Sequence, residues 1–148
     1  MQALEMIAAE MRVELRIVEG LEALATYCTG WSKANAHLIR SAIVDDYIWD
    51  DPDEGRVTKS ELSAFLTKLK AKIDGMRSCS PSTPYLTLSD VVIHRSQSTI
   101  TVWGSFAVPG TGIQGMSHIR VGDKGVISEY RAQRTEPYVR VAGIRSRG

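Results

Sequence analysis

Apolar residues recur every three or four positions through the first half of the chain and at every second position through much of the second half. The first spacing is typical of amphipathic helices and the second of strands with one buried face. The helical spacing predicts a lead-in helix, two further helices and a longer helix that opens with the capping box Thr58-Lys59-Ser60-Glu61 and ends at Gly75. These helices are predicted over residues 1–18, 20–30, 33–43 and 58–75, with Ser32 as the cap of the third.

A loop rich in serine and proline separates these helices from a series of predicted strands. One short extended segment precedes it, near Tyr47, and the alternating pattern follows it to the end of the chain. The predicted strands cover residues 85–94, 99–108, 112–121 and 126–134. Helices followed by an antiparallel meander indicate an α+β fold in which the sheet curls around the helices.

The length of 148 residues is that of one domain with a single core. We therefore expect one domain over residues 1–148, with a helical extension over 1–18 and a C-terminal tail over 136–148. A net charge of +1 with 24% charged residues provides no broad basic surface, so nucleic acid is not an expected partner. Only the tail is basic, and we interpret it as a disordered or partner-draped extension.

The N-terminus and the cysteines favour a cytoplasmic protein. Glu5 and Glu10 lie where a signal peptide would be basic or apolar, and no apolar run is long enough to span a membrane. Cys28 and Cys79 are far apart and lack metal-ligand spacing, so we interpret both as reduced thiols. No histidine pair has ligand spacing either, and we expect no metal and no membrane association.

The segment 45–52 places several carboxylates beside aromatic and apolar residues. If Trp49 and Asp51 share the inward face of a strand, Asp51 lies against an apolar wall that disfavours its charged form. A carboxylate in such a place is a candidate general base. The alternative is that Asp51 is a turn residue, because aspartate before proline commonly ends a strand.

Both faces of the predicted strand over 99–108 are partly apolar. One face is expected to line an interior pocket, and the other carries Trp103, which needs a cover. A second copy of the sheet is the simplest cover, so we predict a homodimer through the convex sheet face.

Four parts of the sequence, in this order, resemble the nuclear transport factor 2-like superfamily, in particular the SnoaL-like polyketide cyclases and the ketosteroid isomerases. The resemblance extends from about Gly20 to Thr135 and implies a cone: a curved antiparallel sheet wrapped around three helices, with a deep apolar pocket between them. The parts are the helix with Tyr27 and Trp31, the acidic segment 45–52, the lead Gly55-Arg56-Val57, and Gly125-Val126-Ile127-Ser128-Glu129-Tyr130-Arg131.

The resemblance also implies roles for individual residues. In ketosteroid isomerases a tyrosine on the first helix polarises the substrate carbonyl and an aspartate before a proline moves the proton, and Tyr27 and Asp51 match these positions without a gap. Those enzymes carry a second acid on the third long strand, where this chain has Gln114-Gly115-Met116-Ser117-His118, so that donor is absent or replaced. Alternation with Ile119 favours Ser117 as the inward residue and His118 as the outward one, and a bulge would exchange them.

The resemblance thus implies an enzyme without a cofactor, of the isomerase or cyclase type, that removes a proton next to a carbonyl in an apolar small molecule. The alternative is a ligand-binding or dimerisation module of the same fold without chemistry. The residues predicted to line the pocket are Trp31, Trp49, Phe65, Val102, Phe106, Ile119 and Tyr130.

Overall fold

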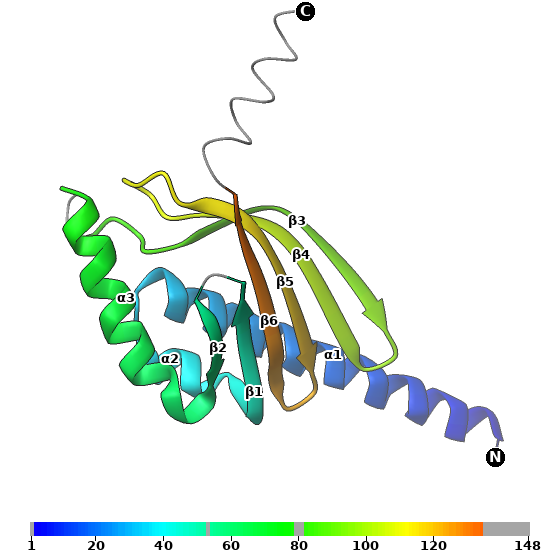
Figure 1. The fold of residues 1–148 in the computed structure, drawn as a ribbon. Helices are drawn as coiled ribbons and strands as arrows, with labels where there is room; N and C mark the ends of the chain where they lie inside the picture. Colours follow the sequence, from blue (N-terminus) through cyan, green and yellow to red (C-terminus); the bar gives the residue numbers. More distant parts are fainter. Residues whose placement is uncertain (1, 53, 79–81, 135–148) are drawn as a thin grey trace, which may run out of the picture.

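A computed structural model describes residues 2–52, 54–78 and 82–134 of the chain. Within these ranges three α-helices pack on one six-stranded sheet, which confirms the predicted α+β class (Figure 1). The helices are α1 (Gln2–Ser32), α2 (Ala36–Ser41) and α3 (Leu62–Met76), and the 3-10 turn η1 (Lys59–Glu61) precedes α3. The strands are β1 (Ile43–Asp51), β2 (Gly55–Thr58), β3 (Thr87–Ser96), β4 (Thr99–Ala107), β5 (Gln114–Gly122) and β6 (Gly125–Arg134).

The sheet has the strand order β2-β1-β6-β5-β4-β3 and curves strongly over α1 (Figure 1). The predicted meander is present, because β3 to β6 pair in sequence and antiparallel. The sheet was predicted to be antiparallel and is mixed, since β1 pairs in parallel with β6, with Trp49 opposite Glu129. The helix and meander between these two strands bring the chain back to run beside β1 in the same direction. The hairpin strand β2 was not predicted, because its four residues are too short for an alternating pattern.

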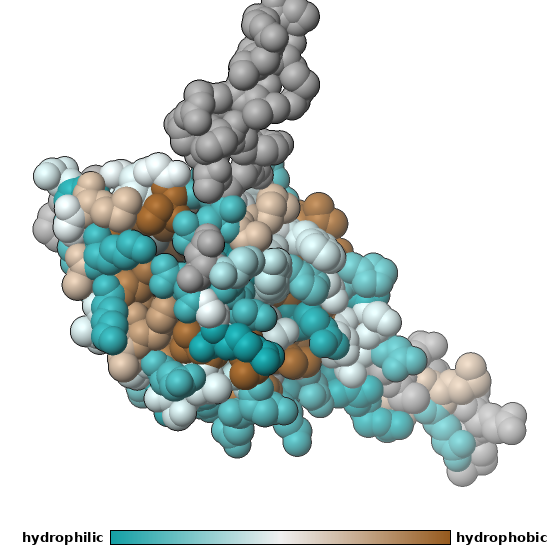
Figure 2. Space-filling view, in the orientation of Figure 1, coloured by the Kyte–Doolittle hydropathy of each residue, from teal (hydrophilic) through white to brown (hydrophobic). Residues whose placement is uncertain are grey.

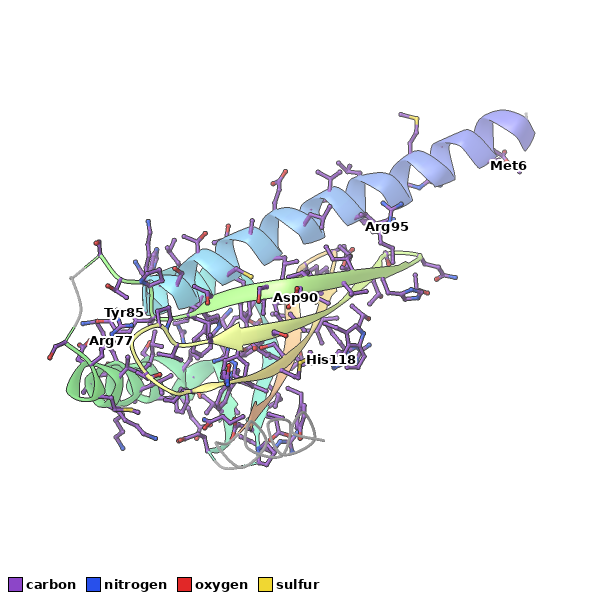
Figure 3. All side chains as sticks on the ribbon, turned by 90° about the horizontal axis from the view of Figure 1, so that it is seen from above. Met6, Arg77, Tyr85, Asp90, Arg95 and His118 are labelled. Carbon is purple, nitrogen blue, oxygen red and sulfur yellow. The ribbon has the colours of Figure 1, made fainter. Side chains whose placement is uncertain are left out.

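The lead-in helix and the next predicted helix form one continuous helix, so the predicted break at Gly20 is wrong. Gly20 lies in close contact with the sheet. A Cβ atom on Gly20 would lie 3.2 Å from Ile100 Cδ1 and 3.3 Å from the carbonyl oxygen of Gly122. Beyond this contact the N-terminal half of α1 runs out past the hairpin of β3 and β4, with Met6 far from the sheet (Figure 3).

Two capping predictions have different outcomes. The capping box at Thr58 is confirmed, with Glu61 Oε1 accepting from the Thr58 amide at 3.0 Å, and α3 ends at Met76 beside the predicted Gly75. Ser32 does not cap α2, because α1 continues through it. Asn35 is the cap, and its Oδ1 accepts from the Leu38 amide at 3.1 Å.

The two faces of the sheet differ in exposure. The inner face is covered by the helices and carries the core, including Tyr27 from α1, Trp49 from β1 and Val102 from β4. The outer face exposes Trp103 and Tyr130, whose exposed fractions are 49% and 46%. No helix of the described residues is both long and apolar enough to cross a membrane.

Gly115 on β5 provides a test of the packing between strands. A Cβ atom there would clash with the carbonyl oxygen of Ala132 and lie 2.8 Å from Phe106 Cε2. We expect Gly115→Ala to lower the free energy of unfolding by about 1–3 kcal/mol in urea denaturation, the range for overpacking a core. The control Gly75→Ala, where nothing lies within 4 Å of the new atom, should stabilise α3 by up to about 1 kcal/mol. Equal effects of the two substitutions would contradict this packing.

Candidate functional site

A cluster of polar side chains lies inside the cone, where apolar groups surround it. Glu129 Oε1 accepts from the Tyr27 hydroxyl at 2.5 Å, and Glu129 Oε2 accepts from Ser117 Oγ and from Arg131 Nε, both at 2.9 Å. The Tyr47 hydroxyl lies 2.6 Å from that of Tyr27 and donates to it, because the Tyr27 proton is already directed to the carboxylate. Each of these five side chains is buried.

The sequence brings this cluster together through strand alternation. Glu129 and Arg131 are two residues apart on β6 and so point to the same, inner face. Ser117 lies opposite Arg131 in the register between β5 and β6, and Tyr47 comes from β1. Tyr27 is presented by α1, the helix that covers this face. Four elements therefore meet at one carboxylate.

The Arg131 guanidinium lies among three aromatic rings and beside one carboxylate. Its Cζ is 4.5 Å from the ring centroid of Trp31, 5.4 Å from that of Trp49 and 5.2 Å from that of Phe106. Arg131 Nη2 lies 2.8 Å from Glu129 Oε2. Burial by itself lowers the pKa of Arg131, but the Glu129 charge and the two buried phenols outweigh it and raise this pKa above its usual value. The cation is therefore held inside the core.

Burial and the neighbouring carboxylate keep the phenols of the cluster protonated. Burial, followed by the charge of Glu129, raises the pKa of Tyr27 and of Tyr47 well above the usual value. The same two causes raise the pKa of the Cys28 thiol, which lies nearby on α1, to about 11. These groups are hydrogen-bond donors at neutral pH, and the Cys28 thiol is unreactive there.

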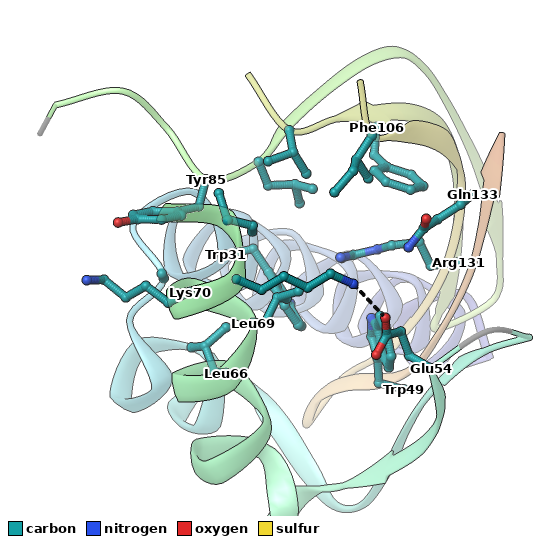
Figure 4. Close-up of a pocket in the computed structure, with 16 residues that line it drawn as sticks. Trp31, Trp49, Glu54, Leu66, Leu69, Lys70, Tyr85, Phe106, Arg131 and Gln133 are labelled. Carbon is teal, nitrogen blue, oxygen red and sulfur yellow. Dashed lines mark hydrogen bonds and ion pairs between the residues drawn. The ribbon is translucent and has the colours of Figure 1, made fainter. Parts of the chain in front are cut away.

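Two small cavities of about 40 Å³ each flank Arg131, and Trp31 lines both of them. The first lies between α3 and the sheet and is walled by Trp49, Leu66, Leu69 and Phe106 (Figure 4). The second is lined by Tyr27, Ser117, Ile119 and Glu129. Because one buried water needs about 10–15 Å³, each cavity holds only a few waters as it stands.

An ion pair lies at the edge of the first cavity. Lys72 Nζ on α3 is 3.4 Å from Glu54 Oε1 in the turn between β1 and β2, and both residues line the cavity (Figure 4). Both side chains are partly exposed, so the pair is weak and can separate. The surrounding surface in Figure 2 shows apolar groups between hydrophilic ones around α3.

Asp51 is buried, with an exposed fraction of 1%, and shares the inner face of β1 with Trp49 as strand alternation predicts. Its Oδ1 accepts from the Glu54 amide at 3.0 Å, which is the turn contact expected of aspartate before proline. Asp51 lines neither cavity beside Arg131. However, Asp50 lies opposite Tyr130 in the parallel pairing of β1 with β6. Asp51 and Arg131 follow them on the two strands, and both point inward.

The two residues proposed to assist catalysis lie on opposite faces. Ser117 points inward and is buried, as alternation with Ile119 predicts. His118 points outward and stacks on Trp103, with ring centroids 4.1 Å apart, so it is not part of the interior site. Burial and the nearby Arg120 lower the pKa of His118.

Some of the predicted pocket residues line the two cavities and others do not. Trp31, Trp49 and Phe106 line the first cavity, and Trp31 and Ile119 line the second. Phe65 packs on the Trp49 ring at 4.8 Å and Val102 lies in the core, and neither lines these cavities. The placement of Tyr130 in the pocket is wrong, because Tyr130 precedes the inward Arg131 and therefore points to the outer face.

The sequence analysis missed Glu129, Arg131 and Tyr47 as site residues. The expectation of an absent second acid was drawn from residues 114–118 on β5, whereas the buried carboxylate comes from the adjacent strand β6. Alternation could have placed Glu129 and Arg131 on one face, but not beside Tyr27. Residues 2–52, 54–78 and 82–134 contain no group of three or more histidine, cysteine or acidic side chains that could hold a metal ion.

Comparison with known proteins identifies the fold. No protein-family model and no curated protein matches the chain. A solved NTF2-like protein with a cystatin-like fold from Novosphingobium aromaticivorans is 14% identical, with a TM-score of 0.65 over 88% of this chain and 89% of that one. The chain has the cystatin-like, nuclear transport factor 2-like (NTF2-like) fold.

Two further solved structures of similar fold have names that mention an activity. A candidate polyketide cyclase from Xanthomonas campestris is 9% identical, with a TM-score of 0.55 over 83% of this chain and 96% of that chain. A candidate ketosteroid isomerase from Kribbella flavida is 9% identical, with a TM-score of 0.52 over 80% of each chain. At these identities the likeness establishes the NTF2-like fold, and the activities are those of the neighbours.

The raised pKa values predict how stability depends on pH. Above about pH 10 the unfolded chain loses the Tyr27 proton while the folded chain keeps it, so the unfolded state binds fewer protons and the free energy of unfolding falls as pH rises. We expect Tyr27→Phe to reduce this decline by about 0.7 kcal/mol per pH unit on average between pH 9 and 11, because the unfolded phenol is only half ionised at pH 10, and Tyr27→Phe/Tyr47→Phe to reduce it about twice as much. Urea denaturation at several pH values between 9 and 11 measures it, and identical slopes in all three proteins would contradict the burial of these phenols.

Proposed function

We propose that this NTF2-like chain is a small-molecule enzyme that removes a proton next to a carbonyl, without a cofactor, inside the cone. The observation that supports this most is the buried cluster of Tyr27, Ser117, Glu129 and Arg131 in the wall between two cavities. Polar groups of this kind in an apolar cavity are typical of small-molecule sites.

The stability of the fold alone does not account for such a cluster. Desolvation of a buried ion pair often outweighs the attraction between its charges, and well-packed apolar residues are frequently as stable or more stable. Glu129 and Arg131 are nevertheless fully inside the core, next to space that side chains do not fill. This favours a role toward a bound molecule.

In this proposal Asp51, which lines neither cavity in the present form, is the base that takes the proton once the first cavity has enlarged. Two observations support this assignment: Asp51 is buried, and it is a neighbour of Arg131 across the two strands. Asp50 on β1 pairs with Tyr130 on β6, so the next residue on each strand, Asp51 and Arg131, points inward. The hydroxyls of Tyr27 and Ser117 both donate to Glu129. We therefore assign these two residues to holding Glu129, which in turn orients Arg131, and not to direct contact with the substrate.

Binding of a molecule larger than a few waters requires the first cavity to enlarge. The ion pair between Lys72 and Glu54 links α3 to the turn after β1 at the edge of this cavity. Its separation would let α3 move away from the sheet. The present structure corresponds, in this proposal, to the closed form of the site.

A second candidate function is ligand binding without chemistry. It is favoured by the Tyr27 hydroxyl, which already donates to Glu129 and accepts from Tyr47, and by Asp51, which lines neither cavity. The two candidate functions differ in whether Asp51 takes a proton from the bound molecule.

Hydrogen–deuterium exchange of a simple ketone separates the two functions. In D₂O, abstraction of an α-proton from cyclopentanone and return of a deuteron produces a mass and NMR signal without any net reaction. We expect the chain to accelerate this exchange and Asp51→Asn to lower the rate at least about 100-fold, as for loss of a general base.

The matched control is Asp50→Asn, because Asp50 is the partly exposed neighbour that pairs with Arg56 at 3.9 Å. This variant should exchange cyclopentanone at the parent rate. If Asp51→Asn retains the parent rate while circular dichroism shows a folded protein, Asp51 is not the base. If the parent gives no acceleration but binds the ketone, the second function holds.

We also propose that two copies associate through the outer face of the sheet. Trp103, His118 and Tyr130 are direct neighbours across β4, β5 and β6, and they form an aromatic row at this face in which Trp103 and Tyr130 are exposed and His118 is partly buried. Exposed apolar rows of this kind are typical of interfaces between subunits.

The test is the mass of the protein in solution. Light scattering after gel filtration should give a dimer for the parent and a monomer for Trp103→Lys, since the lysine would place a charge in the centre of the interface. Lys68→Glu, on the exposed side of α3, should remain a dimer. A parent chain that is monomeric at millimolar concentration would rule out this association.

A further inference from the structure

Two indole N–H groups in the wall of the interior site have no hydrogen-bond partner among the described residues. They are Nε1 of Trp31 on α1 and Nε1 of Trp49 on β1. Both residues line the first cavity, and both side chains are buried. A buried donor without an acceptor is costly, and native proteins leave few of them. Two such donors beside one cavity point to an acceptor that is supplied from outside the chain.

The guanidinium of Arg131 adds a third donor group at the same place. Arg131 Nη2 is buried and lies 2.8 Å from Glu129 Oε2, but it is not aligned for a hydrogen bond. The rings of Trp31 and Trp49 are stacked at 6.1 Å, and the guanidinium lies over both. The two indoles and the guanidinium all belong to side chains that line the first cavity.

The charges around the first cavity decide between a neutral and an anionic acceptor. Each cation that lines it already has a carboxylate partner: Arg131 has Glu129, Lys72 has Glu54 and Lys70 has Asp74. Separation of Lys72 from Glu54 on opening releases one positive and one negative charge together, so a buried carboxylate ligand would have no net counter-charge, which is strongly unfavourable. A neutral oxygen acceptor satisfies the N–H groups without that cost.

We infer that the interior site binds a neutral carbonyl oxygen through the indole N–H groups of Trp31 and Trp49, with the Arg131 guanidinium beside them. This inference rests on the proposed function and specifies its ligand class: an apolar ketone or related carbonyl compound, and not a carboxylate. It also moves the recognition of the oxygen from the Tyr27 hydroxyl, which is engaged by Glu129, to the two indoles.

The three tryptophans of the chain give a direct measurement. In ¹⁵N-tryptophan-labelled protein, three indole N–H resonances can be followed, and single Trp→Phe variants assign them. Cyclopentanone should shift the Trp31 and Trp49 resonances saturably, while Trp103 on the outer face serves as the internal reference. Methylenecyclopentane replaces the oxygen by CH₂ at similar shape, and cyclopentanecarboxylate supplies a charged acceptor.

We expect methylenecyclopentane and cyclopentanecarboxylate each to bind at least about tenfold more weakly than cyclopentanone, the loss expected for an unmade or uncompensated polar contact. Trp49→Phe keeps a ring in the wall but removes one donor, and it should reduce the preference for cyclopentanone over methylenecyclopentane. A native Trp103 resonance in this variant verifies that it is folded.

Equal binding of methylenecyclopentane, tighter binding of the carboxylate, or no saturable shift of Trp31 and Trp49 would overturn the inference. These outcomes are distinct from failure of the proposed chemistry. Indole shifts without α-deuteration of cyclopentanone would support the ligand class and reject the proton transfer. Deuteration that depends on Asp51 without indole shifts would support the proton transfer and reject the ligand class.

Discussion

The structure of the interior depends on the ion pair between Glu129 and Arg131. Glu129 accepts hydrogen bonds from Tyr27 on α1, Ser117 on β5 and Arg131 on β6, and Tyr47 on β1 reaches it through the Tyr27 hydroxyl. Because a buried carboxylate without these donors would be strongly unfavourable, the pair fixes the relative positions of the helix and three strands.

The apolar surroundings give this pair its chemical character. The three rings around Arg131 exclude water and hold the guanidinium by cation–π contacts, while Glu129 compensates its charge. With the charge compensated locally, the remaining N–H groups of the site can recognise a neutral acceptor. The same enclosure leaves only small cavities beside the guanidinium.

The alternation of side chains assigns separate tasks to the two faces of the sheet. Ser117, Glu129 and Arg131 point to the interior, and their neighbours His118 and Tyr130 point outward toward Trp103. A change of one residue in register would exchange the two sets, which ties the interior site and the exposed aromatic row to the same strand pairing. The interior polar cluster and the exposed aromatic residues of the outer face are therefore properties of one register.

The sequence by itself determined the features that depend on local periodicity. These include the α+β class, the meander, the capping box at Thr58 and the inward positions of Asp51 and Ser117, because the periods of 2 and 3.6 residues and the cap are encoded within a few positions. Only the tertiary structure decided that Trp49 on β1 lies beside Glu129 on β6 and that Tyr27 and Tyr47 meet at that carboxylate. The pairing of two strands separated by a helix and a meander depends on how the whole chain packs, and no local pattern of apolar residues specifies it.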